Sequence, residues 1–538
     1  MSGPGILYVT MQPQEGLHPA QFHEWYNNEH GPTRLKLPRI FTNGLRYRAT
    51  DGQSPEVLAV YDVTSMSHLE TTAYTCLRAN RSPREAETID QVKVNRSFYD
   101  LGTTAKSDTF RPIEQLTNDE AEGLVLVAVT ATLKNIAGAE KEYLKWYEEE
   151  HIPMLSKVPG WLRTRLFQTS TLESAGEITY LALHDYAKQN GLGGPQYKAA
   201  VSTEWRDEVA KYIETKGRRT YELFYIFGSG STDLSNLSKL PAGTPTFTSQ
   251  DGQTTTVPGA SPSIESFIPT KDGLVIPYRL EGNPDPKAPT VAFSNSLLTS
   301  LRMWDAFVAI LKKARPDLRI LRYDTRGRHS IPQPPVAANL DMLADDISSL
   351  LDGLRISKLQ ALVGVSMGGA TTLKFALKNP ERLSKFVACD FNVASSAANT
   401  EGWKSRIQVA ETPTEDGKPG ITNLAGATVE RWYHPRSMKK PCAPWMVGMV
   451  AANDVEGFRY SCQALWDYDM KPQMKGCKVP GLLVVGEADG KGALVKAMDG
   501  FKGLVGEGGV PLNVVPEAGH LPMCENPQGF WDAIKDFV

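Results

Sequence analysis

The chain has 538 residues, which is too long for one ordinary hydrophobic core and predicts two or three domains. Its hydrophobic content of 41% and charged content of 22% are typical of a globular protein. A formal net charge of −3 supplies no basic surface, so we expect no nucleic acid as a partner.

Other features of the sequence exclude further classes of protein. No apolar run approaches the ~20 residues that cross a bilayer, so we expect no membrane association. The first residues do not combine a cationic stretch with a long apolar one, and we expect no secretory signal. The six cysteines are scattered without a CxxC pair, which favours free thiols and predicts a cytoplasmic protein. The oligomeric state is left open.

A nine-residue motif occurs twice in the N-terminal half, as EWYNNEHGP at 24–32 and as KWYEEEHIP at 145–153. Strand-like and helical patterns surround both copies in the same order. Each copy predicts strand, helix, strand, strand, helix and strand, the order of a ferredoxin-like α+β unit. We expect a first repeat over 1–110 and a second over 111–228. Because one face of each sheet needs an apolar partner, the repeats should pack as a pseudo-dimeric α/β barrel.

The Trp-Tyr pair followed by Glu-His-x-Pro resembles the EthD-like members of the dimeric α/β-barrel superfamily. The resemblance implies a cleft in each unit, with His30 and His151 as residues of a possible second site. In that superfamily the cleft hosts oxygenation, dehydration or no known chemistry. One interpretation is proton transfer on a phenolic or polyketide-like ligand, because histidine titrates near neutral pH. The other is that each histidine stabilises the end of its helix.

The residues around the two histidines differ between the copies. Two additional glutamates in the second copy should favour the protonated form of His151 if they lie close to it. The first copy has Gly31 where the second has the bulky Ile152, so we expect more room for a ligand beside His30. The Trp-Tyr pairs themselves are interpreted as core between helix and sheet.

Residues 229–263 are rich in serine, threonine, glycine and proline and contain few large apolar residues. Such a composition does not bury enough surface to order itself, so we predict a linker here. From residue 264 to 538, short β-branched runs alternate with helical patterns. This alternation predicts an α/β domain with a doubly wound, mainly parallel sheet.

The stretch GVSMG at 364–368 follows a predicted strand and precedes a predicted helix. This context is that of a nucleophile elbow, in which small residues flank a serine on a tight turn. Ser366 is therefore the predicted nucleophile, and it needs a base. His520, in a loop before the last helix, is the predicted base, and Asp489, after a late strand, is the predicted acid. Glu487 and Asp390 are rivals for the acid.

The oxyanion of such a reaction needs two backbone N–H donors. One is expected from Met367, directly after the nucleophile. The other is expected from the loop SNSLLTSLRMWD after an early strand, with Leu297 as the best candidate. Asn295 and Ser296 precede it in that loop.

Several motifs of this half, among them SNSLLTSLRMWD, LRYDTRG, GVSMGG, VERWYHP and AGHLPMCENP, resemble the 3-oxoadipate enol-lactonase branch of the α/β-hydrolases. The resemblance implies the triad above, an enol-lactone as substrate and a helical cap over about 393–477. It also suggests substrate-binding residues. Either Arg406 or Arg431 could bind a carboxylate of the substrate or could form a surface ion pair. The stretch RGRHSIP departs from the family pattern and leaves the lactone open. The substrate-binding candidates are Asn295, Trp304, Arg406 and Trp432.

Three functions follow from these patterns. The first is a serine hydrolase that opens a lactone or cleaves an ester of a small cyclic or polyketide-like substrate. The second is a bifunctional tailoring enzyme, in which the barrel performs dehydration, cyclisation or oxygenation and the hydrolase cleaves a lactone or a β-diketone C–C bond. The third is a receptor-like protein without catalysis, which the apparently complete triad disfavours. We expect a small-molecule substrate, no cofactor and no metal.

Overall fold

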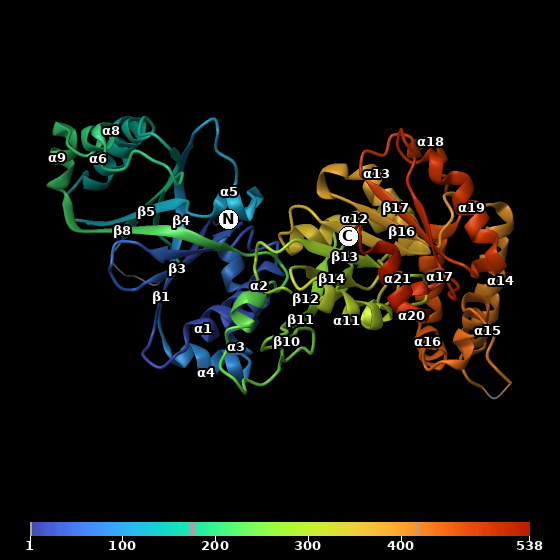
Figure 1. Ribbon diagram of the computed structural model, residues 1–538. Coiled ribbons are helices and arrows are strands. Elements are labelled where there is room, and N and C mark those ends of the chain that lie inside the picture. Colours follow the sequence, from blue (N-terminus) through green and yellow to red (C-terminus); the bar gives the residue numbers. More distant parts are fainter. Residues whose placement is uncertain (1–2, 173–177, 416) are drawn as a thin grey trace. The chain divides into compact units, whose positions relative to one another are not determined.

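The computed structural model describes residues 3–172, 178–415 and 417–538. The chain forms two compact units, one ending at Ser229 and the other beginning at Gly230 (Figure 1). No helix within the described residues is long and apolar enough to cross a membrane. The cytoplasmic location stays a prediction.

The first unit is built around a closed antiparallel barrel in the strand order β1-β3-β2-β8-β5-β7-β6-β4. Its strands are β1 Gly5–Pro13, β2 Leu45–Ala49, β3 Val57–Val63, β4 Val92–Lys106, β5 Val125–Leu133, β6 Trp161–Thr169, β7 Thr179–Tyr186 and β8 Ile213–Ile226. Its helices and turns are α1 Pro19–Trp25, η1 Tyr26–His30, α2 Gly31–Leu35, η2 Met66–Glu70, α3 Thr72–Ala79, α4 Pro83–Asp90, η3 Ile113–Gln115, α5 Asn118–Ala121, α6 Ala139–Trp146, η4 Tyr147–His151, α7 Ile152–Leu155, α8 Pro195–Ala200 and α9 Glu204–Ala210.

The two sequence repeats contribute four strands each, and in each repeat the strand order is fourth, first, third, second. The barrel closes where β2 pairs with β8 and where β4 pairs with β6. One chain therefore builds a barrel from two copies of the same unit, as the repeat led us to expect. The assignment of the copies to ferredoxin-like, EthD-like units stays a prediction.

The alternation of side chains along the strands separates three cores in this unit. Leu126 and Ala128 of β5 lie inside the barrel, whereas Val127 and Ala131 face the helices of the second repeat. An equivalent helix-to-sheet core lies in the first repeat and contains Trp25 and Tyr26. The period of two along a strand explains this division. Both Trp-Tyr pairs belong to these cores, as interpreted from the sequence, and Trp146 and Tyr147 also line a cavity.

The repeated motif forms a π-helical turn in both copies, η1 and η4. The glutamate of each turn accepts a hydrogen bond from the N-cap hydroxyl of the repeat's later helix. Ser82 Oγ donates to Glu29 at 2.5 Å, and Thr203 Oγ1 donates to Glu150 at 2.6 Å. Since these hydroxyls also cap α4 and α9, the motif fastens two helices of each unit together. This shared structural task explains why the motif occurs twice.

The second unit contains one sheet of ten strands in the order β18-β17-β16-β15-β13-β14-β12-β11-β10-β9. Parallel pairing runs from β14 through β13, β15, β16 and β17 to β18, and the remaining pairs are antiparallel. The strands are β9 Phe247–Thr248, β10 Thr255–Val257, β11 Ser263–Pro269, β12 Val275–Gly282, β13 Thr290–Ser294, β14 Arg319–Tyr323, β15 Ala361–Val365, β16 Phe386–Cys389, β17 Gly481–Gly486 and β18 Leu512–Val515.

Helices accompany this sheet and also fill the long connection between β16 and β17, where the sequence predicts a cap (Figure 1). The helices of that connection are α14 Ala397–Glu411, α15 Ile421–Trp432, η7 Ser437–Lys439, α16 Cys442–Ala451, α17 Val455–Cys462, η8 Gln463–Leu465 and α18 Lys471–Met474. The others are α10 Leu234–Leu237, η5 Leu301–Trp304, α11 Asp305–Ala314, α12 Leu340–Gly353, α13 Met367–Lys378, η6 Pro380–Arg382, η9 Asp489–Gly492, α19 Ala493–Phe501, η10 Lys502–Leu504, α20 Pro522–Glu525 and α21 Pro527–Ile534.

The prediction of a linker over 229–263 is wrong. This segment belongs to the second unit and contains α10, β9 and β10. Two of its few large apolar residues, Leu234 and Leu237, are buried in the core of the second unit. The backbone of β10 pairs with β11 and extends the sheet edge. Sheet hydrogen bonds can order a polar segment that has little apolar surface of its own.

Glu281 is a buried carboxylate that pairs with three cations of the second unit. Its side chain is only 2% exposed and is paired with Arg279, Lys312 and Arg322, and these cations lower its pKa to about 2 against the desolvation of burial. The pairs therefore stabilise the second unit above the unfolded-state pKa of the carboxyl, and this stability is lost as the pH falls toward 2.

Glu281→Gln should lower the free energy of unfolding at neutral pH by on the order of 3 kcal/mol, because three cations lose their buried partner. The deficit should shrink in acid, where the wild-type carboxyl is protonated as well. Chemical denaturation of the second unit at neutral and acidic pH measures both values. Glu507→Gln, at an exposed position, is the control. An equal deficit at both pH values would contradict the ion-pair account.

Candidate active site

Ser366 lies on a sharp turn between β15 and α13, as the G-x-S-x-G pattern predicts. Its φ of 58° and ψ of −119° are strained for a residue with a side chain. Its backbone N–H donates to the carbonyl of Cys389 in β16 at 2.9 Å, which fastens the turn to the sheet. The side chain is only partly buried, in contrast to the strand and helix residues on either side of it.

The glycines around Ser366 are required by close packing. A Cβ at Gly364 would lie 2.1 Å from the carbonyl oxygen of Gly368. A Cβ at Gly368 would lie 2.2 Å from the carbonyl oxygen of Ser294 and 2.6 Å from that of Asn295. The second contact also locates the loop after β13 directly against the first turn of α13. This is the contact that the predicted oxyanion hole needs.

The two predicted oxyanion donors lie on these adjoining segments. Met367 is the first residue of α13, so its N–H has no acceptor within the helix. Leu297 lies in the loop after β13, and the next residue, Leu298, has a φ of 69°. A left-handed residue in this place turns the chain sharply, which is how a loop brings an N–H toward a point in front of a helix.

Asn295 and Trp304 do not line a substrate pocket, which corrects their prediction as substrate-binding residues. Both side chains are fully buried, and Trp304 Nε1 donates to Asn295 Oδ1 at 2.9 Å. Asn295 Nδ2 in turn donates to the carbonyl of Tyr323 at 2.8 Å. The Trp304 ring packs against Phe293 in the hydrophobic core. The two residues hold the loop that carries Leu297, so their contribution to the site is indirect.

His520 and Asp489 are brought together. His520 Nδ1 lies 2.7 Å from Asp489 Oδ2, and the two side chains are 15% and 10% exposed. Asp489 follows β17, one strand beyond β16, which in turn lies beside the β15 strand that leads to Ser366. All three strands are parallel, so their carboxyl ends lie at one edge of the sheet, where α/β folds place their sites.

Trp432 forms a wall beside His520. Their rings stack at 5.6 Å between centroids, and the carbonyl of Trp432 accepts a hydrogen bond from the backbone N–H of His520 at 2.7 Å. A Cβ at Gly519 would lie 2.1 Å from that carbonyl, so only glycine lets the loop come so near. Trp432 therefore lies next to the predicted base, and its role in substrate binding stays a prediction.

Neither rival for the acid is the carboxyl that lies 2.7 Å from His520 Nδ1, because that carboxyl belongs to Asp489. Glu487 accepts a hydrogen bond from the backbone N–H of Glu517 at 3.0 Å. Asp390 is fully buried and accepts from the N–H of Gly486 at 2.8 Å. Polar side-chain atoms of Asp390, Asp489 and His520 lie within 4.8 Å of one another. Burial and the neighbouring Asp489 raise the pKa of Asp390 well above its ordinary value, which favours the protonated form of this carboxyl.

Glu525 is a residue of the site that the sequence reasoning missed. Its carboxyl accepts hydrogen bonds from the backbone N–H groups of Gly519 at 2.9 Å, Leu521 at 3.3 Å and His434 at 2.7 Å. It therefore fixes the loop on both sides of His520, and burial raises its pKa to about 7. A glutamate five residues after the histidine, the last residue of the short helix α20, was the available signal.

The unusual stretch RGRHSIP is held by the core and by the cap connection. His329 Nε2 lies 2.7 Å from Asp324 Oδ2, and the other oxygen of Asp324 accepts the N–H of Leu301. Arg328 donates to the carbonyl of Met449 in α16 at 3.2 Å. The two additional side chains thus join β14, the loop after β13 and the cap connection.

Two arginines of the cap connection lie in mutual electrostatic range. The Arg406 guanidinium lies over the Trp403 ring at 4.6 Å, and burial lowers its pKa. Desolvation, together with the charge of Arg406, lowers the pKa of Arg431 to about 10, whereas Asp489 acts in the opposite direction. Within the described residues neither arginine has a carboxylate within ion-pair distance. This favours the carboxylate-holding interpretation over a surface ion pair.

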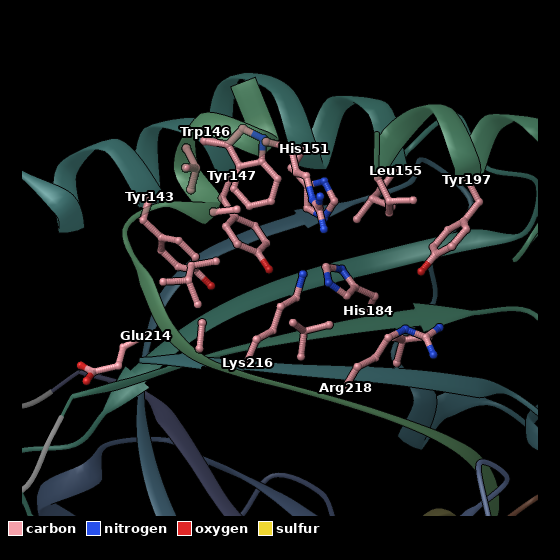
Figure 2. A pocket seen from close by; sticks show the side chains of 18 of the residues that line it. Tyr143, Trp146, Tyr147, His151, Leu155, His184, Tyr197, Glu214, Lys216 and Arg218 are labelled. Atoms are coloured by element: carbon pink, nitrogen blue, oxygen red, sulfur yellow. The ribbon is translucent and has the colours of Figure 1, made fainter. Parts of the chain in front are cut away.

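The histidines of the repeats lie at equivalent places beside two clefts of very different size. His30 Nδ1 lies 2.7 Å from Glu85 Oε1 beside a cavity of about 50 Å³. His151 Nδ1 lies 3.1 Å from the carbonyl of Ala200 beside a cavity of about 280 Å³ (Figure 2). The prediction of more room beside His30 is therefore wrong. The reason is that the first cleft is filled by side chains other than that of the residue that follows the histidine.

The prediction of a protonated His151 is also wrong. Burial lowers its pKa to about 4, and the charges of Lys216 and Arg206 act in the same direction. The two additional glutamates do not compensate, because Glu148 accepts a hydrogen bond from Thr103 and Glu149 lies 4.0 Å from the ammonium group of Lys145. His151 is therefore neutral at neutral pH.

Comparisons with known proteins concern the second unit. The sequence profile of the Alpha/beta hydrolase family matches residues 297–533. The chain is 28% identical to 3-oxoadipate enol-lactonase 2 of Acinetobacter baylyi over 49% of this chain and 94% of that protein. It is 28% identical to enol-lactonase 1 of that organism over 51% of this chain and 96% of that protein.

Two solved structures are also similar to the chain over about half of its length. A hydrolase from Pseudomonas aeruginosa is 29% identical with a TM-score of 0.44, and covers 51% of this chain and 97% of its own. The enol-lactonase from Burkholderia xenovorans is 29% identical with a TM-score of 0.42, and covers 49% of this chain and 96% of its own. Together with the family match, the sequence similarity identifies the second unit as an α/β-hydrolase domain.

Proposed function

We propose that the second unit hydrolyses a lactone or ester of a small cyclic substrate through an acyl-enzyme on Ser366. The observation that carries the proposal is the His520–Asp489 pair at 2.7 Å, on the same sheet edge as the strained Ser366 turn. Similarity to enol-lactonases supports a lactone as the substrate. Assay of the purified chain against an enol-lactone, an aryl ester and a β-diketone tests the reaction class.

In this mechanism His520 Nε2 accepts the proton of Ser366 Oγ while the oxygen attacks the carbonyl carbon. Asp489 holds Nδ1–H, which leaves Nε2 as the basic nitrogen and stabilises the imidazolium. The N–H groups of Met367 and Leu297 stabilise the oxyanion. The C–O bond of the lactone then breaks, and the imidazolium returns its proton to the leaving oxygen. A water molecule repeats the sequence and releases the acid and Ser366.

The substrate we propose carries a free carboxylate, as the enol-lactone of 3-oxoadipate does. The support is the pair Arg406 and Arg431, which lacks a carboxylate of the protein's own in the described part of the chain. The partly buried Arg406 and the exposed Arg431 together make an anionic partner favourable, because charge-assisted hydrogen bonds are about twice as strong as neutral ones.

Arg431→Met should raise KM for this enol-lactone about tenfold or more and leave KM for neutral phenyl acetate unchanged. Loss of one charged hydrogen bond, worth roughly 1.5–3 kcal/mol, accounts for this size. Steady-state kinetics on both substrates measure the split. Arg436→Met, at an exposed arginine that pairs with Glu517, is the matched control. An equal rise of KM for both substrates would indicate that the cap is distorted, and it would contradict a role of Arg431 in binding the substrate carboxylate.

A second candidate function is a bifunctional enzyme whose barrel, as an EthD-like module, acts on the same pathway. The favouring observation is the cavity of about 280 Å³ in the first unit. The Ser366 site would then cleave an ester, a lactone or a β-diketone, since each of these reactions passes through an oxyanion. His151→Ala is expected to leave ester hydrolysis unchanged and to alter turnover of the shared substrate only.

A further inference from the structure

The cleft of the second repeat lies between the sheet and the helices of the first unit. Figure 2 shows Tyr147, His151 and Leu155 above the cavity and His184, Lys216 and Arg218 on the strands below it. An apolar cavity of roughly 150 Å³ already admits a benzene ring. The volume of about 280 Å³ therefore has room for a substituted or fused aromatic ring.

The first repeat shows how the same cleft looks when it is closed. Strand registers relate the two copies: Met11 pairs with Val94 in the first, and Ala131 pairs with Lys216 in the second. Further positions correspond by their spacing from the motif histidine or from the helix N-cap. At four corresponding positions the side chain in the first cleft is larger than the one in the second cleft. The pairs are Arg34 and Leu155, Tyr61 and His184, Met11 and Ala131, and Ile89 and Ala210.

These filling residues are tied into the first repeat. Arg34 donates to the carbonyl of His30 at 2.7 Å, and the hydroxyl of Tyr61 donates to that of Tyr26 at 3.1 Å. Nothing comparable occupies the second cleft, where Leu155 and Ala210 are shorter. The second cleft is open because of particular substitutions on four different elements.

The second cleft is also cationic. Lys216 stands where the first repeat has Val94, and Arg206 stands where it has Glu85, three residues after the N-cap. Glu214 is the only acidic residue among the described residues that line the cavity. Lys216 is exposed in this cleft and has no ion pair within the described part of the chain, and Arg206 and Arg218 line the same cleft. An anion in the cleft would relieve this uncompensated charge.

His151 adds a directed acceptor to this cleft. The carbonyl of Ala200 can only accept, so Nδ1 of His151 carries the proton that joins them. With the imidazole neutral, Nε2 is left with a lone pair and no proton. The His184 ring lies 6.3 Å away, centroid to centroid, and burial keeps it neutral as well. Nε2 of His151 therefore requires a donor group on any ligand that fills the cavity.

We propose that this cleft binds a small hydroxylated aromatic carboxylate. The ring would lie against the apolar and aromatic walls, the carboxylate at Lys216 and Arg218, and the hydroxyl would donate to Nε2 of His151. The site lies entirely in the first unit and is separate from the Ser366 site of the hydrolase unit. It is therefore a second small-molecule site, and not part of the hydrolase machinery.

Isothermal titration of the full chain with three probes tests each part of this proposal. The probes are 6-hydroxy-2-naphthoate, 2-naphthoate, which lacks the hydroxyl, and 2-naphthol, which lacks the carboxylate. The hydroxynaphthoate should bind at least tenfold more tightly than either of the others, because each missing group forfeits one hydrogen bond that the cleft is built to make.

Two variants and one control locate the binding. Ala210→Ile, which imports the first-repeat residue, should abolish binding of all three probes. Lys216→Met should weaken binding of both carboxylates at least tenfold and leave 2-naphthol unchanged. His30→Gln, in the closed first cleft, should change nothing. Unchanged aryl ester hydrolysis and circular dichroism verify that each variant is folded.

The proposal is overturned by either of two results. The first is no heat of binding for the hydroxynaphthoate at millimolar concentration with the wild-type chain. The second is binding that survives Ala210→Ile in a folded protein, since the ligand would then occupy another place. Both results leave the proposed hydrolase reaction untouched, because that reaction is measured separately on the second unit.

Discussion

Ser366→Ala is expected to lower kcat for ester and lactone hydrolysis by a factor on the order of 10³ or more. The hydroxyl oxygen is the atom that forms the acyl-enzyme bond, and alanine removes it without disturbing the glycine contacts of the turn. Because alanine is as strained as serine at a φ of 58°, the variant should unfold at nearly the same denaturant concentration. Initial rates on the enol-lactone and on phenyl acetate measure the loss.

Ser357→Ala is the matched control, since this serine is exposed on the same unit. It should retain full activity. If Ser366→Ala hydrolyses every cleaved substrate at the wild-type rate, the acyl-enzyme mechanism is wrong, whatever the fold of the domain.

Asp489→Asn is expected to lower kcat by on the order of 10³ to 10⁴, with the protein still folded. An amide whose N–H donates to Nδ1 of His520 forces the proton onto Nε2 and removes the base, and an amide whose neutral oxygen accepts from Nδ1 stabilises the imidazolium less than the carboxylate does. The loss should be in kcat and not in KM, since Asp489 stabilises the imidazolium and has no role in ground-state binding. Stopped-flow measurement of phenyl acetate hydrolysis separates the two constants.

Asp390→Asn is the control that distinguishes the two neighbouring carboxyls. Because burial raises the pKa of Asp390 and favours its neutral form, an amide of the same shape should replace it with less than about a tenfold loss of kcat. A large loss in this variant together with a small loss in Asp489→Asn would reverse the assignment of the acid.

The parts of the site that sequence predicts well are those that depend on local geometry. The turn at Ser366 needs glycine two residues before and two residues after the serine, so the stretch GVSMG predicts it. Asp489 follows a strand and His520 follows a glycine whose Cβ has no room, and both features are visible in the sequence. The repeated motif is also local, because its glutamate accepts a hydrogen bond from the helix-capping hydroxyl in both copies.

The parts that the sequence did not predict depend on packing between distant segments. Trp304 reads as a pocket residue, yet its indole N–H is used by Asn295 in the core. The size of the two clefts is set by residues such as Arg34 and Ala210, far from the motif and on other elements. The polar segment before β11 has little apolar surface, but a sheet edge supplies its hydrogen bonds. Only the fold brings these partners together.

The identity of the nucleophile is the central claim of this account, and covalent labelling tests it most directly. An organophosphate such as paraoxon phosphorylates a serine hydroxyl that a neighbouring imidazole activates, and the adduct is stable enough for mass spectrometry of the intact chain and its peptides. We expect one adduct per chain on the peptide that contains Ser366, and none in Ser366→Ala or His520→Ala. A stoichiometric adduct on another residue, accompanied by loss of hydrolysis, would contradict the assignment of Ser366 as the nucleophile.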